Sequence, residues 1–144
     1  MRFTPHVTVA TIVEDCGRYL MVEEISSNRV VFNQPAGHLE ADESLIQAAH
    51  RETLEETGWT VNITGLTGLY LFRGENGVTY QRTCFVASPL EHRPEVTLDD
   101  GILCAHWLTL DEIRAREAQL RSPMVLQCIL DYLAKPRYPL ELIR

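Results

Sequence analysis

Apolar and β-branched positions predict several strands in the first third of the chain. Residues 6–14 alternate loosely and are rich in Val, Thr and Ile, which is typical of a buried strand. A turn at 15–17 separates them from a second apolar run at 19–25, so we expect a hairpin. After a short polar tip, residues 29–32 lead into a tight loop that ends at Gly37.

The same patterns predict a longer hairpin and a last strand further along the chain. Residues 60–73 and 78–87 have strand character and flank an Asn-Gly dipeptide, which favours a tight turn. Residues 91–101 contain a proline and two adjacent aspartates and are expected to form a loop. A short strand is expected over 102–108.

Helix signals occur in three places. The clearest covers residues 44–57, where Ser44 and Gln47 form a capping-box pattern and Gly58 supplies a C-terminal stop. A second capping box predicts a helix over about 109–120. A serine cap and a first-turn proline open a third helix at residue 122, which is expected to end at Lys135-Pro136. Its predicted apolar stripe contains Val125, Ile129 and Tyr132.

The order of these elements predicts an α/β fold in which a mixed β-sheet is sandwiched between helices. A chain of 144 residues has the length to bury one sizeable core. We find no repeat, low-complexity run or linker. Residues 1–144 are therefore expected to form a single domain.

Composition narrows the function classes. The formal net charge of −7 argues against a protein that binds duplex nucleic acid. No apolar run approaches the roughly 20 residues of a membrane-spanning helix, and the first residues lack the apolar core of a signal peptide. The four cysteines form no Cys-x-x-Cys pair, so we expect reduced, mostly buried thiols in a cytoplasmic protein. The sequence does not distinguish a monomer from a homodimer.

Three carboxylates gather on the first predicted helix. Glu52, Glu55 and Glu56 are spaced i, i+3 and i+4, so they share one face and repel one another. The last two also lie near the helix C-terminus, where the helix dipole disfavours anions. A solvated acidic face is one interpretation. The other is a site for Mg²⁺ or Mn²⁺, because a divalent cation reverses this repulsion.

The wider stretch decides between these interpretations, because residues 37–59 resemble the Nudix box of the Nudix hydrolase family. They comprise a glycine, five residues, a glutamate, seven residues, then Arg-Glu-x-x-Glu-Glu-x-Gly and an apolar residue. Thr53 departs from the aliphatic residue usual in the family, at a position expected to face the core. The resemblance implies an α/β/α sandwich. It also implies a reaction in which water attacks a phosphoanhydride with the help of Mg²⁺ or Mn²⁺.

The resemblance also assigns roles within the box. Gly37 is expected to adopt a backbone geometry that other residues resist, and to direct its carbonyl to the metal. Arg51 can pair with Glu43 or Glu55 and fix their orientation. The residues assigned to the metal are Gly37, Glu43, Glu52, Glu55 and Glu56, with Glu43 expected behind the others.

The general base is not fixed by the resemblance. Family members take it from the helix glutamates or from an acidic residue on a later loop, so Glu55 and Glu56 come first. Asp99 and Asp100 follow as loop candidates, with a solvated turn before Gly101 as the alternative for both.

Substrate contacts are expected outside the box. Arg73 and Arg82 are candidates for bidentate phosphate binding, although either one alone is more typical of an exposed strand charge. Tyr80 is a candidate for stacking on a base, with core packing as the alternative. Gln34, just before the box, is placed to contact a phosphate or a ring.

The resemblance extends beyond the box to residues 5–10, 33–43, 120–123 and 137–141. These blocks are similar to a bacterial branch of the family that removes orthophosphate from nucleoside tri- and diphosphates and from hydroxymethylpyrimidine pyrophosphate. The expected substrate is therefore a small nucleotide or pyrimidine pyrophosphate. Two alternatives remain: a Nudix enzyme that cleaves nucleoside diphosphate sugars or dinucleoside polyphosphates, and a module that binds nucleotides without catalysis.

Overall fold

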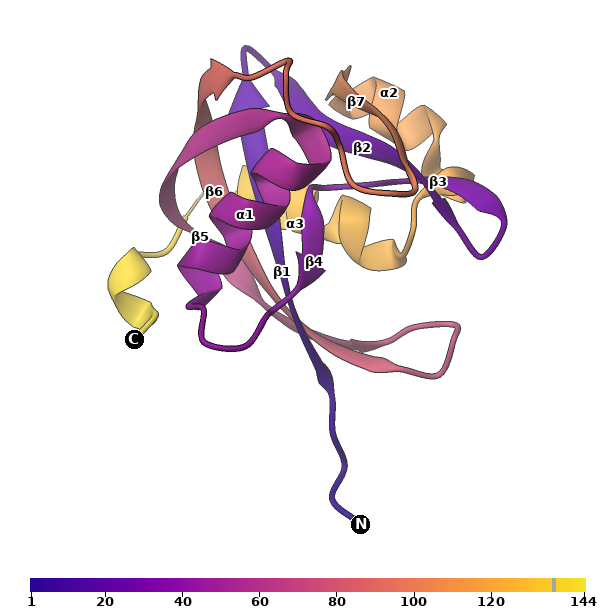
Figure 1. Ribbon diagram of the computed structural model, residues 1–144, viewed down its shortest axis with the longest axis vertical. Helices are drawn as coiled ribbons and strands as arrows, with labels where there is room; N and C mark the ends of the chain where they lie inside the picture. The colour runs from indigo at the N-terminus through magenta and orange to yellow at the C-terminus, as the bar shows by residue number, and fades with distance from the viewer. Residues whose placement is uncertain (136) are drawn as a thin grey trace.

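A computed structural model describes residues 1–135 and 137–144 (Figure 1). Pro136, part of the expected stop of the last helix, lies outside these residues. In chain order, the elements are β1 (His6–Asp15), β2 (Arg18–Ser26), β3 (Arg29–Asn33), β4 (Ala36–His38), α1 (Leu45–Thr57), β5 (Trp59–Arg73), β6 (Thr79–His92), β7 (Ile102–Thr109), α2 (Leu110–Ala115), η1 (Glu117–Gln119), α3 (Pro123–Ala134) and η2 (Leu140–Leu142).

Within the described residues, seven strands form one mixed sheet with the order β3-β2-β1-β6-β5. β1 runs parallel to β6 and antiparallel to β2 and to the short β4. β7 pairs with β2, whose register shifts between Glu23 and Glu24. At the centre of the sheet, β1, which precedes residues 37–59, therefore lies next to β6, which follows them.

Helices cover both faces of the sheet, with α1 on one face and α3 on the other (Figure 1). The apolar core accordingly has two parts. The α1 part contains Val9, Val13, Leu20, Ala48, Ala49 and Phe85, and the α3 part contains Ala10, Ile12, Met21, Val125, Cys128 and Ile129. The predicted sandwich of helices around a mixed sheet is confirmed.

The first helix forms as its sequence predicts. Ser44 accepts a hydrogen bond from the backbone of Gln47, and the Gln47 side chain accepts one from the backbone of Ser44. Gly58 closes the helix with φ 75°, a left-handed conformation that glycine adopts without a steric penalty. Thr53 is fully buried, and its hydroxyl donates to the Ala49 carbonyl at 2.8 Å. The hydroxyl at this core position is thus satisfied inside the helix.

The expected helix over 109–120 is wrong in its length. α2 ends at Ala115, and a separate 3₁₀ turn follows over Glu117–Gln119. The reason is tertiary, because Leu120 forms a parallel bridge with Phe32 and the backbone N–H of Arg121 donates to the Phe32 carbonyl at 2.9 Å. A continuous helix would remove residues 120 and 121 from this pairing.

The end of β6 also differs from the prediction. β6 continues to His92, because it pairs with a strand that begins at Trp59, directly after the helix. On α3, Val125, Cys128 and Ile129 are buried, and Tyr132, expected in the same stripe, is half-buried and packs against this core. Of the four free cysteines, Cys84 and Cys128 are buried and the other two are exposed, so fewer thiols are buried than expected.

None of the helices in the described part of the chain combines the length and the apolar character needed to cross a bilayer.

Candidate active site

Three carboxylates converge where α1 faces the loop before β7. Oxygen atoms of Glu52, Glu55 and Asp99 all lie within 4.8 Å of one another. The loop is anchored to the helix, because the backbone N–H of Asp99 donates to the Glu55 carbonyl at 3.0 Å. Asp100 is exposed and does not belong to the group. The structure therefore brings together two of the predicted helix glutamates and one of the two loop aspartates.

Gly37 lies on β4 in direct contact with this group. A Cβ atom added at Gly37 would lie 2.2 Å from Cδ and Oε1 of Glu52, far closer than any real contact. The φ angle of Gly37 is not positive. The expectation of an unusual backbone conformation is therefore wrong: glycine is needed here because a side chain would displace the Glu52 carboxylate.

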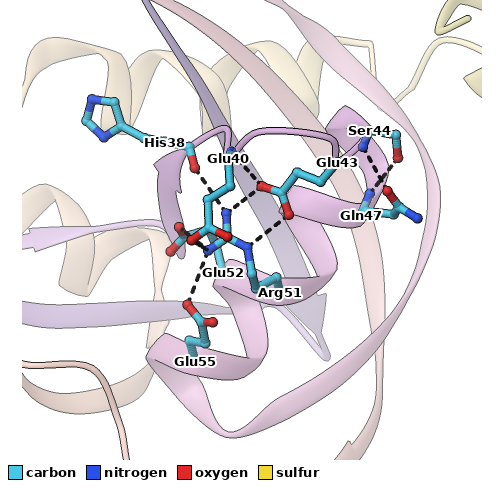
Figure 2. Close-up of polar contacts among 8 residues, drawn as sticks. All are labelled: His38, Glu40, Glu43, Ser44, Gln47, Arg51, Glu52 and Glu55. Atoms are coloured by element: carbon cyan, nitrogen blue, oxygen red, sulfur yellow. Dashed lines mark hydrogen bonds and ion pairs between the residues drawn. The ribbon is translucent and has the colours of Figure 1, made fainter.

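Arg51 holds the carboxylates of the box in place, as Figure 2 shows. Its guanidinium lies between Glu43 on one side and Glu52 and Glu55 on the other. The distances are 2.6 and 3.0 Å to the two Glu43 oxygens, 2.7 Å to Glu52, 3.2 Å to Glu55 and 3.0 Å to the His38 carbonyl. The predicted pairing of Arg51 with Glu43 and Glu55 is confirmed, and Glu52 is an additional partner.

Glu43 is a partner of Arg51 and not a member of the three-carboxylate group. It also accepts a hydrogen bond from the Glu40 backbone N–H at 2.8 Å. The hydrogen bond from Arg51 and the Glu40 N–H both lower the pKa of Glu43. Glu43 is therefore a fixed anion that orients the guanidinium.

Glu56 is not a member of the group of three. Its side chain is buried, with 8% of the residue exposed, and accepts a hydrogen bond from the Ala36 backbone N–H at 2.8 Å. Burial raises the pKa of Glu56 to about 9, and the negative charges of Glu24, Glu52 and Asp99 contribute. Burial also raises the pKa of Glu52. With this pKa, Glu56 holds a proton at pH 7 when no cation is bound, so a cation would compete with a proton for it.

Comparison with known proteins agrees with this site. The NUDIX domain family matches residues 3–128, which include the helix, the carboxylate group and Gly37. The chain belongs to the Nudix family. It is thus a hydrolase of acid anhydrides in phosphorus-containing compounds, as its relatives also indicate.

The relatives of this Nudix chain cover almost its full length. Phosphatase NudJ of Escherichia coli (strain K12) is 39% identical over 141 residues, or 98% of this chain and 92% of that protein. Phosphatase NudJ of Shigella sonnei gives the same figures of 39%, 98% and 92%. A solved NUDIX hydrolase from Nitrosomonas europaea is 48% identical, with a TM-score of 0.96 and coverage of 98% of this chain and 97% of that one.

Two of the predicted substrate contacts are buried against α3. Arg82 is only 4% exposed, and its guanidinium donates to Gln34 Oε1 at 3.2 Å and to Asn33 Oδ1 at 2.9 Å. Gln34 is also buried and donates to the Val125 carbonyl at 2.6 Å. The alternative of an exposed strand charge is wrong for Arg82. A phosphate contact by either residue stays a prediction, and their observed partners are protein groups.

The other two predicted contacts lie on the β5–β6 hairpin. Arg73 is exposed, as expected for a strand charge. Tyr80 is half-buried and stacks on Phe72 with ring centroids 5.4 Å apart. Its ring also meets His6 and His38 edge-on, at centroid distances of 5.7 and 6.2 Å. These aromatic groups adjoin the Nudix box at β4, and a stacking role for Tyr80 stays a prediction.

Two charged residues near the box were missed as site candidates. Glu24 on β2 is 5% exposed and accepts a hydrogen bond from Arg121. The positive charge of Arg121 also contributes, after burial and His6, to the lowered pKa of His38. A glutamate within the predicted strand at 19–25 was the available signal for Glu24, since a buried carboxylate requires a partner. For Arg121, the available signal was its place within residues 120–123, one of the blocks through which the family resemblance extends beyond the box.

The residues present fit a divalent cation. Three carboxylates provide hard oxygen ligands of the kind that Mg²⁺ and Mn²⁺ prefer. The absence of a side chain at Gly37 makes room for the Glu52 carboxylate, which lies where a Cβ would be. The mutual repulsion of these anions is only partly offset by Arg51, whose guanidinium already serves several partners.

Proposed function

We propose that residues 1–144 form one Nudix domain acting as a Mg²⁺-dependent phosphohydrolase on small substrates. The proposed substrates are nucleoside tri- and diphosphates and hydroxymethylpyrimidine pyrophosphate, and the proposed product is orthophosphate. The observation that carries this proposal is the convergence of Glu52, Glu55 and Asp99 against a glycine that leaves room for one of them.

In this proposal the metal is held by Glu52, Glu55 and Asp99, with Glu56 and the Gly37 carbonyl as the further box ligands. A bound Mg²⁺ polarises the phosphate oxygens and lowers the pKa of bound water. Manganese is an alternative, because it accepts the same oxygen ligands. Asp99 joins the set proposed from the box because its loop is hydrogen-bonded to the end of α1.

Protein side chains would position the water and the substrate. Glu55 is proposed as the general base, because its side chain is 40% exposed whereas Glu52 and Glu56 are buried. Water can reach Glu55, and its carboxylate is held by Arg51 at 3.2 Å. Asp99, also exposed, is the next candidate. Arg51 fixes the orientation of both helix carboxylates in the group and does not itself transfer a proton.

The choice of orthophosphate as the product is supported by the relatives. The Escherichia coli and Shigella sonnei relatives, which match 98% of this chain, are phosphatases by name. The blocks at residues 5–10 and 120–123, outside the Nudix box, support the same choice. The net charge of −7 requires that cations at the site offset the repulsion of a polyphosphate substrate, which favours a strict dependence on the metal.

A substrate panel with and without Mg²⁺ tests this proposal. Purified protein would be incubated with nucleoside tri- and diphosphates, hydroxymethylpyrimidine pyrophosphate, a nucleoside diphosphate sugar and a dinucleoside polyphosphate, while orthophosphate and pyrophosphate are measured separately. We expect Mg²⁺-dependent release of orthophosphate from the nucleoside triphosphates, the nucleoside diphosphates and hydroxymethylpyrimidine pyrophosphate. Exclusive cleavage of the last two into nucleotides would refute the proposed product. Binding of nucleotide without turnover of any substrate would refute catalysis.

A further inference from the structure

Arg121 lies on the short segment that joins η1 to α3. Its backbone is held against Phe32: the Arg121 N–H donates to the Phe32 carbonyl at 2.9 Å, and Leu120 forms a parallel bridge with Phe32. Ser122 then caps α3, with its hydroxyl accepting from the Met124 backbone N–H at 3.2 Å. The segment has no regular structure, but these contacts fix its backbone and therefore the point from which the Arg121 side chain extends.

The Arg121 side chain is positioned by Glu24. One guanidinium nitrogen, Nη1, donates to Glu24 Oε1, and the Glu24 side chain is 7% exposed against 47% for Arg121. One end of this ion pair is therefore buried and the other is open to solvent. A guanidinium has five N–H donors in a planar fork. The contacts found within the described residues engage one of them, so the exposed edge can take another anion.

Arg51 and Arg82 already donate hydrogen bonds to several protein groups. Arg51 serves Glu43, Glu52, Glu55 and a backbone carbonyl, and its side chain is 20% exposed. Arg82 is buried and bonded to side chains beneath the sheet. Arg121 differs from both because it combines exposure with a single side-chain partner among the described residues. Of these three guanidiniums, that of Arg121 has donors open to a phosphate.

Glu24 links Arg121 to the metal-binding side of the site. Glu24 and Ile102 are paired across β2 and β7, and the Ile102 backbone N–H donates to the Asp99 carbonyl at 3.1 Å. The register shift at Glu23 and Glu24 occurs at this point of the ladder. A bulge of this kind redirects a side chain, and here it accompanies a buried carboxylate beside the loop that carries Asp99.

We propose that Arg121 binds a phosphate group of the substrate, and that Glu24 holds its guanidinium at the edge of the Glu52–Glu55–Asp99 group. This inference rests on the proposed function and adds a specificity-determining residue to it. A guanidinium that binds a phosphate through two N–H groups favours substrates that place a phosphate against it. Glu24 is a positioning residue and does not contact the substrate.

The test uses two readouts on the full-length protein. The first is the KM and kcat for orthophosphate release from a nucleoside diphosphate in Mg²⁺. The second is the Kd of α,β-methylene adenosine diphosphate, measured calorimetrically in Mg²⁺. Arg121→Gln should raise both KM and Kd by about 10- to 100-fold, the effect of one charge-assisted hydrogen-bonded contact. Arg121→Lys should retain part of the affinity. Arg114→Gln, at an exposed position on α2, is the matched control and should match the wild type.

The double variant Glu24→Gln, Arg121→Gln separates phosphate binding from charge neutralisation. If Arg121 served only to neutralise the buried Glu24, removing both charges would restore wild-type affinity and overturn the proposal. We expect the double variant to bind as weakly as Arg121→Gln. An unchanged Kd in Arg121→Gln also overturns it. A wild type that binds the analogue but releases no orthophosphate would refute the proposed function, while the Kd values would still decide the role of Arg121.

Discussion

Replacing Glu56 by glutamine should stabilise the metal-free protein. Glu56 is buried, and burial raises its pKa from the ordinary 4.5 to about 9. Glutamine has nearly the same shape and keeps an oxygen that can accept the hydrogen bond from Ala36, now 2.8 Å from Glu56 Oε1. The substitution therefore removes the titrating group while leaving the contact in place.

The size and sign of the effect follow from proton linkage. At pH 7 the unfolded chain carries an ionised Glu56, whereas the folded protein carries a protonated one, so folding takes up a proton. This uptake costs the wild type about 3 kcal/mol at pH 7 and less than about 1 kcal/mol at pH 5. Because the folded pKa is the higher one, stability decreases as the pH rises from about 4.5 towards about 9.

The measurement is the free energy of unfolding by urea in the presence of EDTA, at several pH values between 5 and 9. The difference between Glu56→Gln and wild type should grow by about 1.4 kcal/mol for each pH unit. Glu75→Gln, at an exposed position between β5 and β6, is the matched control for the same substitution at a solvated carboxylate. A pH-independent difference, or a variant less stable than the wild type at pH 8, would refute the reasoning about Glu56.

Further predictions concern three parts of the site. Asp99→Asn should weaken Mg²⁺ binding at least about tenfold, whereas Asp100→Asn should leave it unchanged, as calorimetric titration would show. Equal effects of the two would remove Asp99 from the metal site. Gly37→Ala should displace the Glu52 carboxylate and lower kcat by about 100-fold or more, and a normal rate in a folded variant would contradict the close contact. Arg51→Lys should lower kcat by about 10- to 100-fold, because an ammonium group cannot hold several carboxylates in a fork. Wild-type kcat in this variant would show that the fork is dispensable.

The helix and its box could be predicted from local sequence because their determinants are local. Ser44 and Gln47 cap the helix through side chains three residues apart, and Gly58 ends it with its own backbone. The pairing of Arg51 with Glu43 and Glu55 also follows from spacing along the box. The reason for Gly37 did not follow, because it depends on how closely β4 approaches α1.

Contacts between distant segments decided what the sequence left open. Asp99 and Asp100 are adjacent and of one chemical type, and only the packing of their loop on the end of α1 separates them. Arg82 lies in a strand where its charge suggested exposure, yet α3 covers it and Gln34 and Asn33 satisfy it. The early end of α2 likewise results from the pairing of Leu120 with Phe32.

The central claim is that the Nudix site removes orthophosphate in a reaction that requires Mg²⁺ and the Glu52–Glu55–Asp99 group. Phosphorus NMR of a nucleoside triphosphate incubated with the protein and Mg²⁺ tests it most directly, with Glu55→Gln as the matched inactive variant. The account predicts that signals of orthophosphate and nucleoside diphosphate appear together, and that EDTA or Glu55→Gln abolishes both. Signals of pyrophosphate and nucleoside monophosphate, or wild-type rates in Glu55→Gln, would contradict it.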